Sequence, residues 1–230
     1  MRQIVLDTES TGFEPSQGHR LVEIGCIEVF NYLPTGRIFH QYINPERDIP
    51  LGAFEVHGLS REFLSDYPVF KDIAHSFIDF IEDSELIIHN AKFDMKFLNF
   101  ELVRYGHKEI DYSRAIDTLQ MARKKFPGSP VSLDALCKKF GVNNANRKLH
   151  GALLDAELLA EVYLELMGGR QPDLKIASIK EQDGDAINEI ITSEKVLPAR
   201  NFAPSEQEIT DHTKYVEKIA NPIWRETKNS

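Results

Sequence analysis

The sequence has few cysteines and no long apolar run. Its only cysteines, Cys26 and Cys137, both lie within apolar patterns, so the chain lacks the disulfide framework of small secreted domains. No run approaches the roughly 18 consecutive apolar residues of a membrane-spanning helix. The first ten residues, "MRQIVLDTES", contain no apolar stretch of signal-peptide length. We therefore expect a cytoplasmic protein with no membrane association.

An excess of basic residues is also missing, because the formal net charge is −9. This excludes a protein that coats duplex nucleic acid by charge alone. It does not exclude a nucleic-acid enzyme whose metal ions and partner protein supply the positive charge. The length of 230 residues fits one domain of ordinary size with an extension, or two small domains.

The hydrophobic period changes from that of strands to that of helices along the chain. Apolar runs predict strands at 3–7, 20–30 and 36–44, with Gly36 in a hairpin turn between the second and third. From residue 69 onward, amphipathic helices alternate with two short strands. This order predicts an α/β domain over 1–169, with a mixed β-sheet flanked by helices.

The C-terminal part is expected to be a flexible tail with a short helix. Residues 170–203 have few aromatics and weak periodicity, which indicates a linker. In the segment 204–230, Ser205 and Glu208 have the spacing of a capping box. Trp224, the only tryptophan, is typical of a residue that anchors a protein interface. The alternative is a tail that folds back on its own domain.

Four acidic residues are candidate metal ligands. Asp7 and Glu9 end the first predicted strand and point to the same face, because side chains alternate along a strand. Adjacent carboxylates resist burial unless a positive group joins them, and Mg²⁺ prefers such oxygen ligands. Asp94 and Asp155 lie near the starts of predicted helices, beside the strand ends where α/β sites gather. Each acid alone also fits a solvated rim or a complement to a helix dipole.

His150 precedes Asp155 by five residues. On a regular helix their side chains would point roughly 140° apart and could not share a site. We therefore expect His150 on the loop before the helix, from which it reaches the same pocket. An imidazole there is suited to take a proton from water at neutral pH.

Three segments resemble the motifs of the DEDDh 3′→5′ exonucleases: "DTESTG" at 7–12, "HNAKFDMKF" at 89–97 and "HGALLDAELLAEVY" at 150–163. "VHGLS" and "SLDALCKKF" are similar to segments of the epsilon (proofreading) subunits of bacterial DNA polymerase III. The resemblance covers about residues 1–170 and returns at "IWRE" near the end. It implies a ribonuclease-H-like sheet and two Mg²⁺ or Mn²⁺ ions per active site. The ions would be held by Asp7, Glu9, Asp94 and Asp155, with His150 as the general base.

The resemblance also implies a substrate and a reaction. Such an enzyme hydrolyses the last phosphodiester of a DNA 3′ end, and mispaired ends react preferentially because they fray more easily. Val56 and His57 would lie near the terminal nucleotide, beside Asp7, Glu9 and Asp155. His57 also fits a polar turn residue before Gly58. Gly52 stands where replicative members often carry an acidic side chain, and this departure leaves a substrate contact in question.

The implied partners are a frayed or single-stranded DNA 3′ end and the polymerase alpha subunit, which the tail with Trp224 would bind. "QPDLKI" at 171–176 resembles a sliding-clamp peptide, with Gln171, Leu174 and Ile176 as anchors. A small accessory subunit is a further candidate. An RNA-trimming exoribonuclease of the same superfamily is the alternative; its acids would be the same, but it needs no such tail. A non-catalytic module would require a missing acid or histidine, and none is missing.

Overall fold

The computed structural model describes residues 1–145, 147, 149–169 and 204–219. They fall into two units, of which the first holds the predicted domain and the second a single helix. The predicted linker at 170–203 lies outside the described residues, as do the predicted contact residues Gln171, Leu174 and Trp224.

A mixed five-stranded sheet forms the centre of the first unit. Its strands span Arg2–Ser10 (β1), Leu21–Phe30 (β2), Leu33–Tyr42 (β3), Glu85–Ile88 (β4) and Ala115–Asp117 (β5). The spatial order is β3-β2-β1-β4-β5. β2 pairs antiparallel with β1 and β3, whereas β4 pairs parallel with β1 and β5. The predicted mixed sheet is confirmed.

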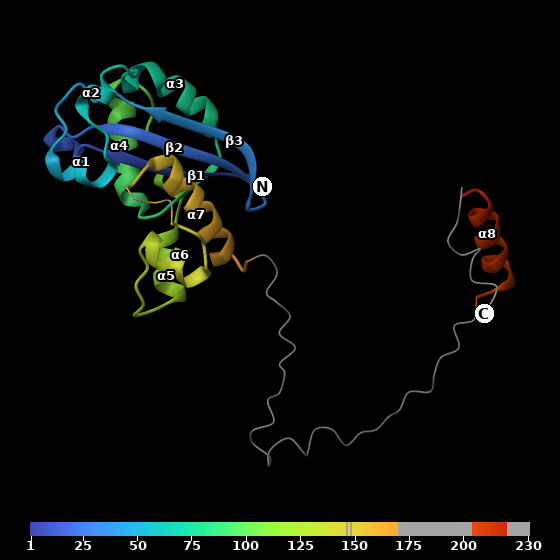
Figure 1. The fold of residues 1–230 in the computed structure, drawn as a ribbon. Helices are drawn as coiled ribbons and strands as arrows, with labels where there is room; N and C mark the ends of the chain where they lie inside the picture. Colours follow the sequence, from blue (N-terminus) through green and yellow to red (C-terminus); the bar gives the residue numbers. More distant parts are fainter. Residues whose placement is uncertain (146, 148, 170–203, 220–230) are drawn as a thin grey trace, which may run out of the picture. The chain divides into compact units, whose positions relative to one another are not determined.

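Helices cover both faces of this sheet (Figure 1). They span Leu51–His57 (α1), Arg61–Leu64 (α2), Phe70–Ile81 (α3), Ala91–Arg104 (α4), Thr118–Lys125 (α5), Leu133–Phe140 (α6) and Ala152–Leu166 (α7), with short 3₁₀ turns at Pro15–Gln17 and Tyr112–Arg114. One apolar core joins the sheet to α3 and α4, and a second joins it to α5, α6 and α7. The predicted flanking helices are therefore confirmed.

Alternate residues of β1 enter the two cores. Ile4 and Leu6 belong to the core under α3 and α4, and Val5 belongs to the core under α7. All three are fully buried, and each burial contributes roughly 1.5–3 kcal/mol. The same alternation carries Asp7 and Glu9 to the α7 side of the sheet. The core pattern of β1 thus sets the direction of the acidic pair.

The hairpin between β2 and β3 turns at Asn31 and Tyr32, so the prediction for Gly36 was wrong. The two turn residues have φ angles of 50° and 69°, as a two-residue type I′ turn requires. Gly36, with a φ angle of 88°, lies within β3, where the pairing with β2 shifts opposite Glu28. The reason is physical: a left-handed glycine suits a strand irregularity as well as a turn.

Helices α1 and α2 have no counterpart in the predicted elements. The only buried residue of α1 is His57, while Leu51 is 71% and Phe54 41% exposed. A helix without a buried apolar stripe leaves no periodic signal in the sequence. Gly58, with a φ angle of 73°, ends α1 in the left-handed conformation. His57 is therefore the last residue of a helix and not part of a simple turn.

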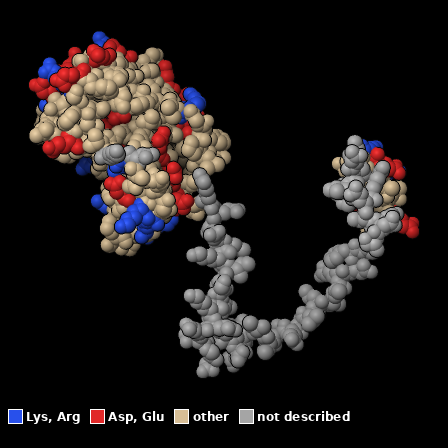
Figure 2. Space-filling view, in the orientation of Figure 1, with Lys and Arg blue, Asp and Glu red and all other residues tan. Residues whose placement is uncertain are grey.

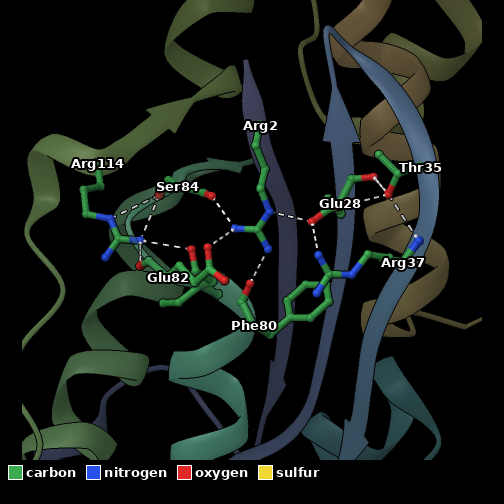
Figure 3. A network of polar contacts seen from close by, with 9 residues as sticks. Arg2, Glu28, Thr35, Arg37, Phe80, Glu82, Ser84 and Arg114 are labelled. Carbon is green, nitrogen blue, oxygen red and sulfur yellow. Dashed lines mark hydrogen bonds and ion pairs between the residues drawn. The ribbon is translucent and has the colours of Figure 1, made fainter.

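Arg2 forms polar contacts that hold the start of β1 against β2 and against the residue before β4 (Figure 3). Its guanidinium lies 2.5 Å from Glu28 Oε2 of β2 and donates to Ser84 Oγ at 2.6 Å. Glu28 also accepts hydrogen bonds from Thr35 Oγ1 at 2.8 Å and Arg37 Nη1 at 2.9 Å. The Glu28 side chain is only 7% exposed, so these donors satisfy a buried carboxylate. The network holds the end of β1 that lies away from Asp7 and Glu9.

The second unit is helix α8, Glu206–Glu217. The predicted capping box is present, because Ser205 Oγ accepts from the backbone N–H of Glu208 and the Glu208 carboxylate accepts from the backbone N–H of Ser205. Taken by itself, the helix has no buried residue. In the part of the chain that the structure describes, no helix combines the length and apolar character needed to cross a membrane.

Candidate active site

The predicted metal ligands and the predicted base line one pocket of about 540 Å³. The pocket lies where β1 ends beside the starts of α4 and α7. Its walls include Asp7, Glu9, Asp94, His150 and Asp155, together with Arg123, Asp134 and Arg147. The fold thus brings together five polar side chains that come from three distant segments of the sequence.

Asp7 and Glu9 are presented by the last residues of β1. They pair with Gly25 and Glu23 of β2, and the pairing shifts immediately after Glu9. Glu9 is buried and Asp7 is half-buried. Because the pairing with β2 continues through both positions, the alternation of the strand directs both carboxylates to the same face.

Asp94 lies in the first turn of α4 and is buried. Thr8 Oγ1 donates a hydrogen bond of 2.7 Å to Asp94 Oδ1. Thr8 is also buried, on the face of β1 opposite to Asp7. The threonine therefore sets the orientation of the aspartate, and the helix N-terminus favours its negative charge.

Asp155 and His150 meet at the start of α7. Asp155 is in the first turn of the helix and is buried. His150 lies on the preceding loop, as the sequence predicts, and its backbone N–H donates to the carbonyl oxygen of Val56 at 3.0 Å. Its side chain is 47% exposed, and Nδ1 lies 3.2 Å from Asp155 Oδ2. The loop thus brings an accessible imidazole next to a buried carboxylate.

Gly25 of β2 permits this close approach. A Cβ atom at this position would lie 2.3 Å from both Ala152 C and Leu153 N of α7, far inside van der Waals contact. The first turn of α7 therefore rests directly on the backbone of β2, next to the strand residue that pairs with Asp7. Any side chain at Gly25 would move Asp155 away from β1.

Arg147 brings a positive charge into the pocket. Its Nε lies 2.5 Å from Asp155 Oδ1, and Nη2 donates to Asp155 Oδ2 at 2.7 Å. Nη2 also lies 2.9 Å from His150 Nδ1, and Nη1 lies 2.8 Å from Asp134 Oδ2. The side chain is only 7% exposed. Arg147 thus forms a bidentate ion pair with Asp155, one of the predicted metal ligands.

The carboxylates of the pocket differ in the direction in which their pKa values are shifted. Burial, together with the charges of the neighbouring carboxylates, raises the pKa of Asp7 well above its usual range and that of Glu9 to about 8. Burial also raises the pKa of Asp94 to about 7, against the opposing hydrogen bond from Thr8. Burial opposes the charge of Asp155 too, but the hydrogen bonds and charges of Arg147 and His150 together outweigh it and lower the pKa. The cluster therefore favours additional positive charge.

A second pocket of about 400 Å³ adjoins the first and shares Glu9 with it. Its walls include Phe13, Val56 and His57. His57 Nδ1 accepts a hydrogen bond of 3.0 Å from the backbone N–H of Leu59, whereas its buried Nε2 has no hydrogen-bond partner among the described residues. Burial lowers the pKa of His57, so the neutral ring carries its proton on Nε2. The pocket wall thus contains a buried donor that has no hydrogen-bond partner among the described residues.

The chemistry of the donors fits a divalent cation. Glu9, His150 and Asp155 each place a ligand atom within 4.8 Å of the other two. Asp7 and Asp94 are not part of this trio but line the same pocket. Sites dominated by carboxylate oxygens suit Mg²⁺ and Mn²⁺, and the raised pKa values indicate carboxylates that lack enough positive charge.

Comparison with known proteins identifies the family. A family profile described as "Exonuclease" matches residues 4–163. The chain belongs to the exonuclease family. Within this family, it is 51% identical to the DNA polymerase III subunit epsilon of Rickettsia felis over 95% of this chain and 97% of that relative. It is 41% identical to the protein of the same name from Escherichia coli K12, over 97% of each chain.

Solved exonuclease structures share the fold. "Exonuclease X in complex with 5′ overhanging duplex DNA" is 25% identical, with a TM-score of 0.57 over 72% of this chain and 90% of that chain. The nuclease domain of 3′hExo, "a DEDDh family member, bound to rAMP", is 18% identical, with a TM-score of 0.62 over 72% of this chain and 91% of that chain. The family match over residues 4–163 and the shared fold over 72% of this chain therefore agree.

Sequence reasoning missed three residues that shape this site. Thr8 stands between two predicted ligands, Asp7 and Glu9. Because side chains alternate along a strand, the sequence could have placed Thr8 on the opposite face of β1, where it contacts Asp94. Gly25 interrupts an otherwise apolar strand, which is a known sign of close backbone approach. Arg147 gave no signal, because its role depends on a loop conformation that no periodicity describes.

Proposed function

We propose that the chain is a proofreading 3′→5′ exonuclease of a bacterial DNA polymerase III, which hydrolyses mispaired 3′-terminal nucleotides. The observation that carries this proposal is the convergence of four carboxylates and His150 in one pocket of an exonuclease-family chain. The relatives named DNA polymerase III subunit epsilon favour DNA as the substrate over RNA trimming. No required acid is missing, which argues against a non-catalytic module.

Asp7, Glu9, Asp94 and Asp155 would hold the metal, which we propose to be Mg²⁺ or Mn²⁺ with two ions per active site. Exonucleases of this family generally use divalent metals. When bound, such ions stabilise the charge that develops on the attacking and leaving oxygens of an in-line displacement. The support from this chain is the oxygen-rich donor set and the crowding of its carboxylates.

His150 would act as the general base that removes a proton from the attacking water. Its side chain is the exposed member of the cluster, which leaves it accessible to solvent and substrate. The backbone hydrogen bond to the carbonyl oxygen of Val56 fixes the loop that carries the ring. Asp155 lies beside the ring and would stabilise the imidazolium that forms.

Val56 and His57 would contact the terminal nucleotide in the second pocket. His57 Nε2–H is a donor without a partner among the described residues, and a buried donor of this kind gains most from a substrate oxygen or nitrogen. Phe13, which is 85% exposed at the edge of this pocket, offers an aromatic surface for a base. A base must leave its pair to enter, which gives frayed mismatched ends their advantage.

The surface around the active-site pocket has basic side chains despite the acidic chain. Figure 2 shows Lys and Arg gathered over the region of α5 and α6. The last turn of α5 carries Arg123, Lys124 and Lys125, and that of α6 carries Lys138 and Lys139. Because Arg123 also lines the pocket, we propose that the DNA strand leaves the active site on this side.

The linker and the C-terminal segment are the proposed binding regions for protein partners. We propose that residues 1–169 form the nuclease domain, that 170–203 are a linker, and that 204–230 bind the polymerase alpha subunit in the cytoplasm through Trp224. Gln171 and Leu174 remain candidates for binding the sliding clamp, and a small accessory subunit is a further candidate partner. In the full chain, Trp224→Ala should abolish capture of the alpha subunit. Tyr112→Ala, at an aromatic residue of the first unit that is 51% exposed, is the matched control and should leave capture unchanged.

The nuclease activity can be tested with 3′-labelled oligonucleotides. The full chain with Mn²⁺ should release deoxynucleoside monophosphates faster from a mismatched than from a matched 3′ end, and faster from DNA than from RNA. Asp7→Asn should lower the rate by orders of magnitude without unfolding the protein. Asp79→Asn, an exposed acid on α3, is the control that should retain full activity. A fully active Asp7→Asn variant would refute the site.

A further inference from the structure

We propose that Arg147 is a tethered cation that occupies Asp155 and His150 until a divalent metal loads, and that it then withdraws to Asp134. The proposal rests on the metal-dependent function proposed above. It adds a positioning residue that lies outside the four carboxylates and the histidine.

The contacts of Arg147 compete directly with metal ligation. Its Nε and Nη2 atoms lie 2.5 Å and 2.7 Å from the two carboxylate oxygens of Asp155. A metal held by Asp155 needs at least one of the same oxygens. Since the guanidinium remains charged at all relevant pH values, it brings like charge to the place where a metal would sit. Arg147 and a metal therefore cannot share Asp155 in this arrangement.

The same side chain also blocks the proposed base. Arg147 Nη2 lies 2.9 Å from His150 Nδ1, and a guanidinium can only donate. Nδ1 must therefore be the acceptor, so its lone pair is not available to take a proton from water. Release of Arg147 would free one oxygen pair and one nitrogen lone pair in a single movement.

A place for the released side chain is present. Arg147 Nη1 already lies 2.8 Å from Asp134 Oδ2, and the Asp134 side chain is 57% exposed at the pocket edge. Asn144 Nδ2 donates to the other Asp134 oxygen at 3.0 Å, which holds this carboxylate in place. The guanidinium can rotate about this outer anchor without losing all its ionic contacts. Movement of one side chain thus suffices, and no change of fold is needed.

The arrangement has a consequence for the metal-free protein. Burial raises the pKa values of three further carboxylates in the pocket, those of Asp7, Glu9 and Asp94. Arg147 is the cation that pairs with the fourth, Asp155. Removing the guanidinium should therefore destabilise the protein without metal and improve its affinity for metal. A residue with a purely structural role would affect stability equally with and without metal.

Nitrogen-15 NMR of arginine Nε–H groups in the full chain tests the movement directly. The Arg147 signal, assigned by its loss in Arg147→Met, should be protected in EDTA and should shift or exchange away as Mg²⁺ is added. The Arg20 signal is the internal control, because Arg20 Nε pairs with buried Glu101 at 2.6 Å, outside the pocket. It should not respond to Mg²⁺. An Arg147 signal that is unchanged at saturating Mg²⁺ overturns the proposal.

Calorimetry and thermal melting provide the second measurement. Arg147→Met should bind Mn²⁺ on the order of tenfold more tightly, the value of one lost charged hydrogen bond, and should melt lower than wild type in EDTA but not in Mn²⁺. Arg37→Met removes one charge at the far network around Glu28 and should leave Mn²⁺ affinity unchanged. Equal Mn²⁺ affinities of Arg147→Met and wild type contradict the proposal alone. Absence of any Mn²⁺ binding contradicts both this proposal and the proposed function.

Discussion

Substituting Gly25 with alanine should separate the two halves of the active site. The added Cβ would lie 2.3 Å from the backbone of Ala152, and ordinary contact begins at 3.4 Å, so α7 must retreat by about 1.1 Å. A displacement of about 1 Å at reacting groups costs on the order of 100-fold in rate. Overpacking of this kind costs about 1–3 kcal/mol in the free energy of unfolding. The first turn of α7 carries Asp155, so the loss should appear mainly in kcat.

The measurement combines mononucleotide release with urea unfolding of the Gly25→Ala variant. Gly106→Ala is the matched control, because no atom lies within 4 Å of the added Cβ at that position and Gly106 lines neither pocket of the site. Its φ angle of 80° disfavours alanine by roughly 1–2 kcal/mol, so this change should lower the stability to a similar extent and leave the rate unchanged. If Gly25→Ala retained wild-type rate and stability, α7 could not rest on β2 as described.

Three further predictions concern other parts of the domain. Glu28→Gln should lower the free energy of unfolding at pH 7 by about 3 kcal/mol, because it breaks a buried charge network. Burial opposes the charge of Glu28, but the hydrogen bonds from Arg2 and Thr35 and the charges of Arg2 and Arg37 together outweigh it and lower the folded-state pKa. The stabilisation by the Glu28 carboxylate is therefore full above the unfolded pKa of 4.5 and is lost as the pH falls through the folded pKa. The free energies of unfolding of wild type and Glu28→Gln, measured by urea titration, should thus converge in acid. A difference that stays constant with pH would contradict this. Thr8→Val should reduce activity about 10-fold by releasing Asp94, with the fold retained by circular dichroism; full activity would show that Thr8 does not orient Asp94. Arg123→Ala should weaken single-stranded DNA binding and lower the slope of log affinity against log salt by about 0.7; an unchanged slope in fluorescence anisotropy would exclude Arg123 from the DNA path.

Much of the site could be predicted because its residues have local signals. Asp7 and Glu9 follow from alternation along a buried strand. The position of His150 before α7 follows from helix geometry, since a helical residue five positions before Asp155 would face elsewhere. These signals depend only on the periods of strands and helices, and the sequence displays those periods directly.

The features that could not be predicted depend on contacts between segments or on turns with more than one solution. Gly25 matters because α7 approaches β2, a fact that the strand sequence alone does not contain. Gly36 was assigned to a turn because glycine favours positive φ, yet Asn31 and Tyr32 adopt the turn and Gly36 serves the strand irregularity. α1 has no apolar stripe to detect, although its end carries His57.

The central claim is that Asp7, Glu9, Asp94 and Asp155 form one site for divalent metal. Crystals of the full chain soaked in Mn²⁺ test it most directly, because manganese is located independently by its anomalous scattering. The account predicts two anomalous peaks in the pocket, each within ligand distance of at least one of these carboxylates. Crystals that show no peak there at millimolar Mn²⁺, with the pocket open to solvent, would contradict it.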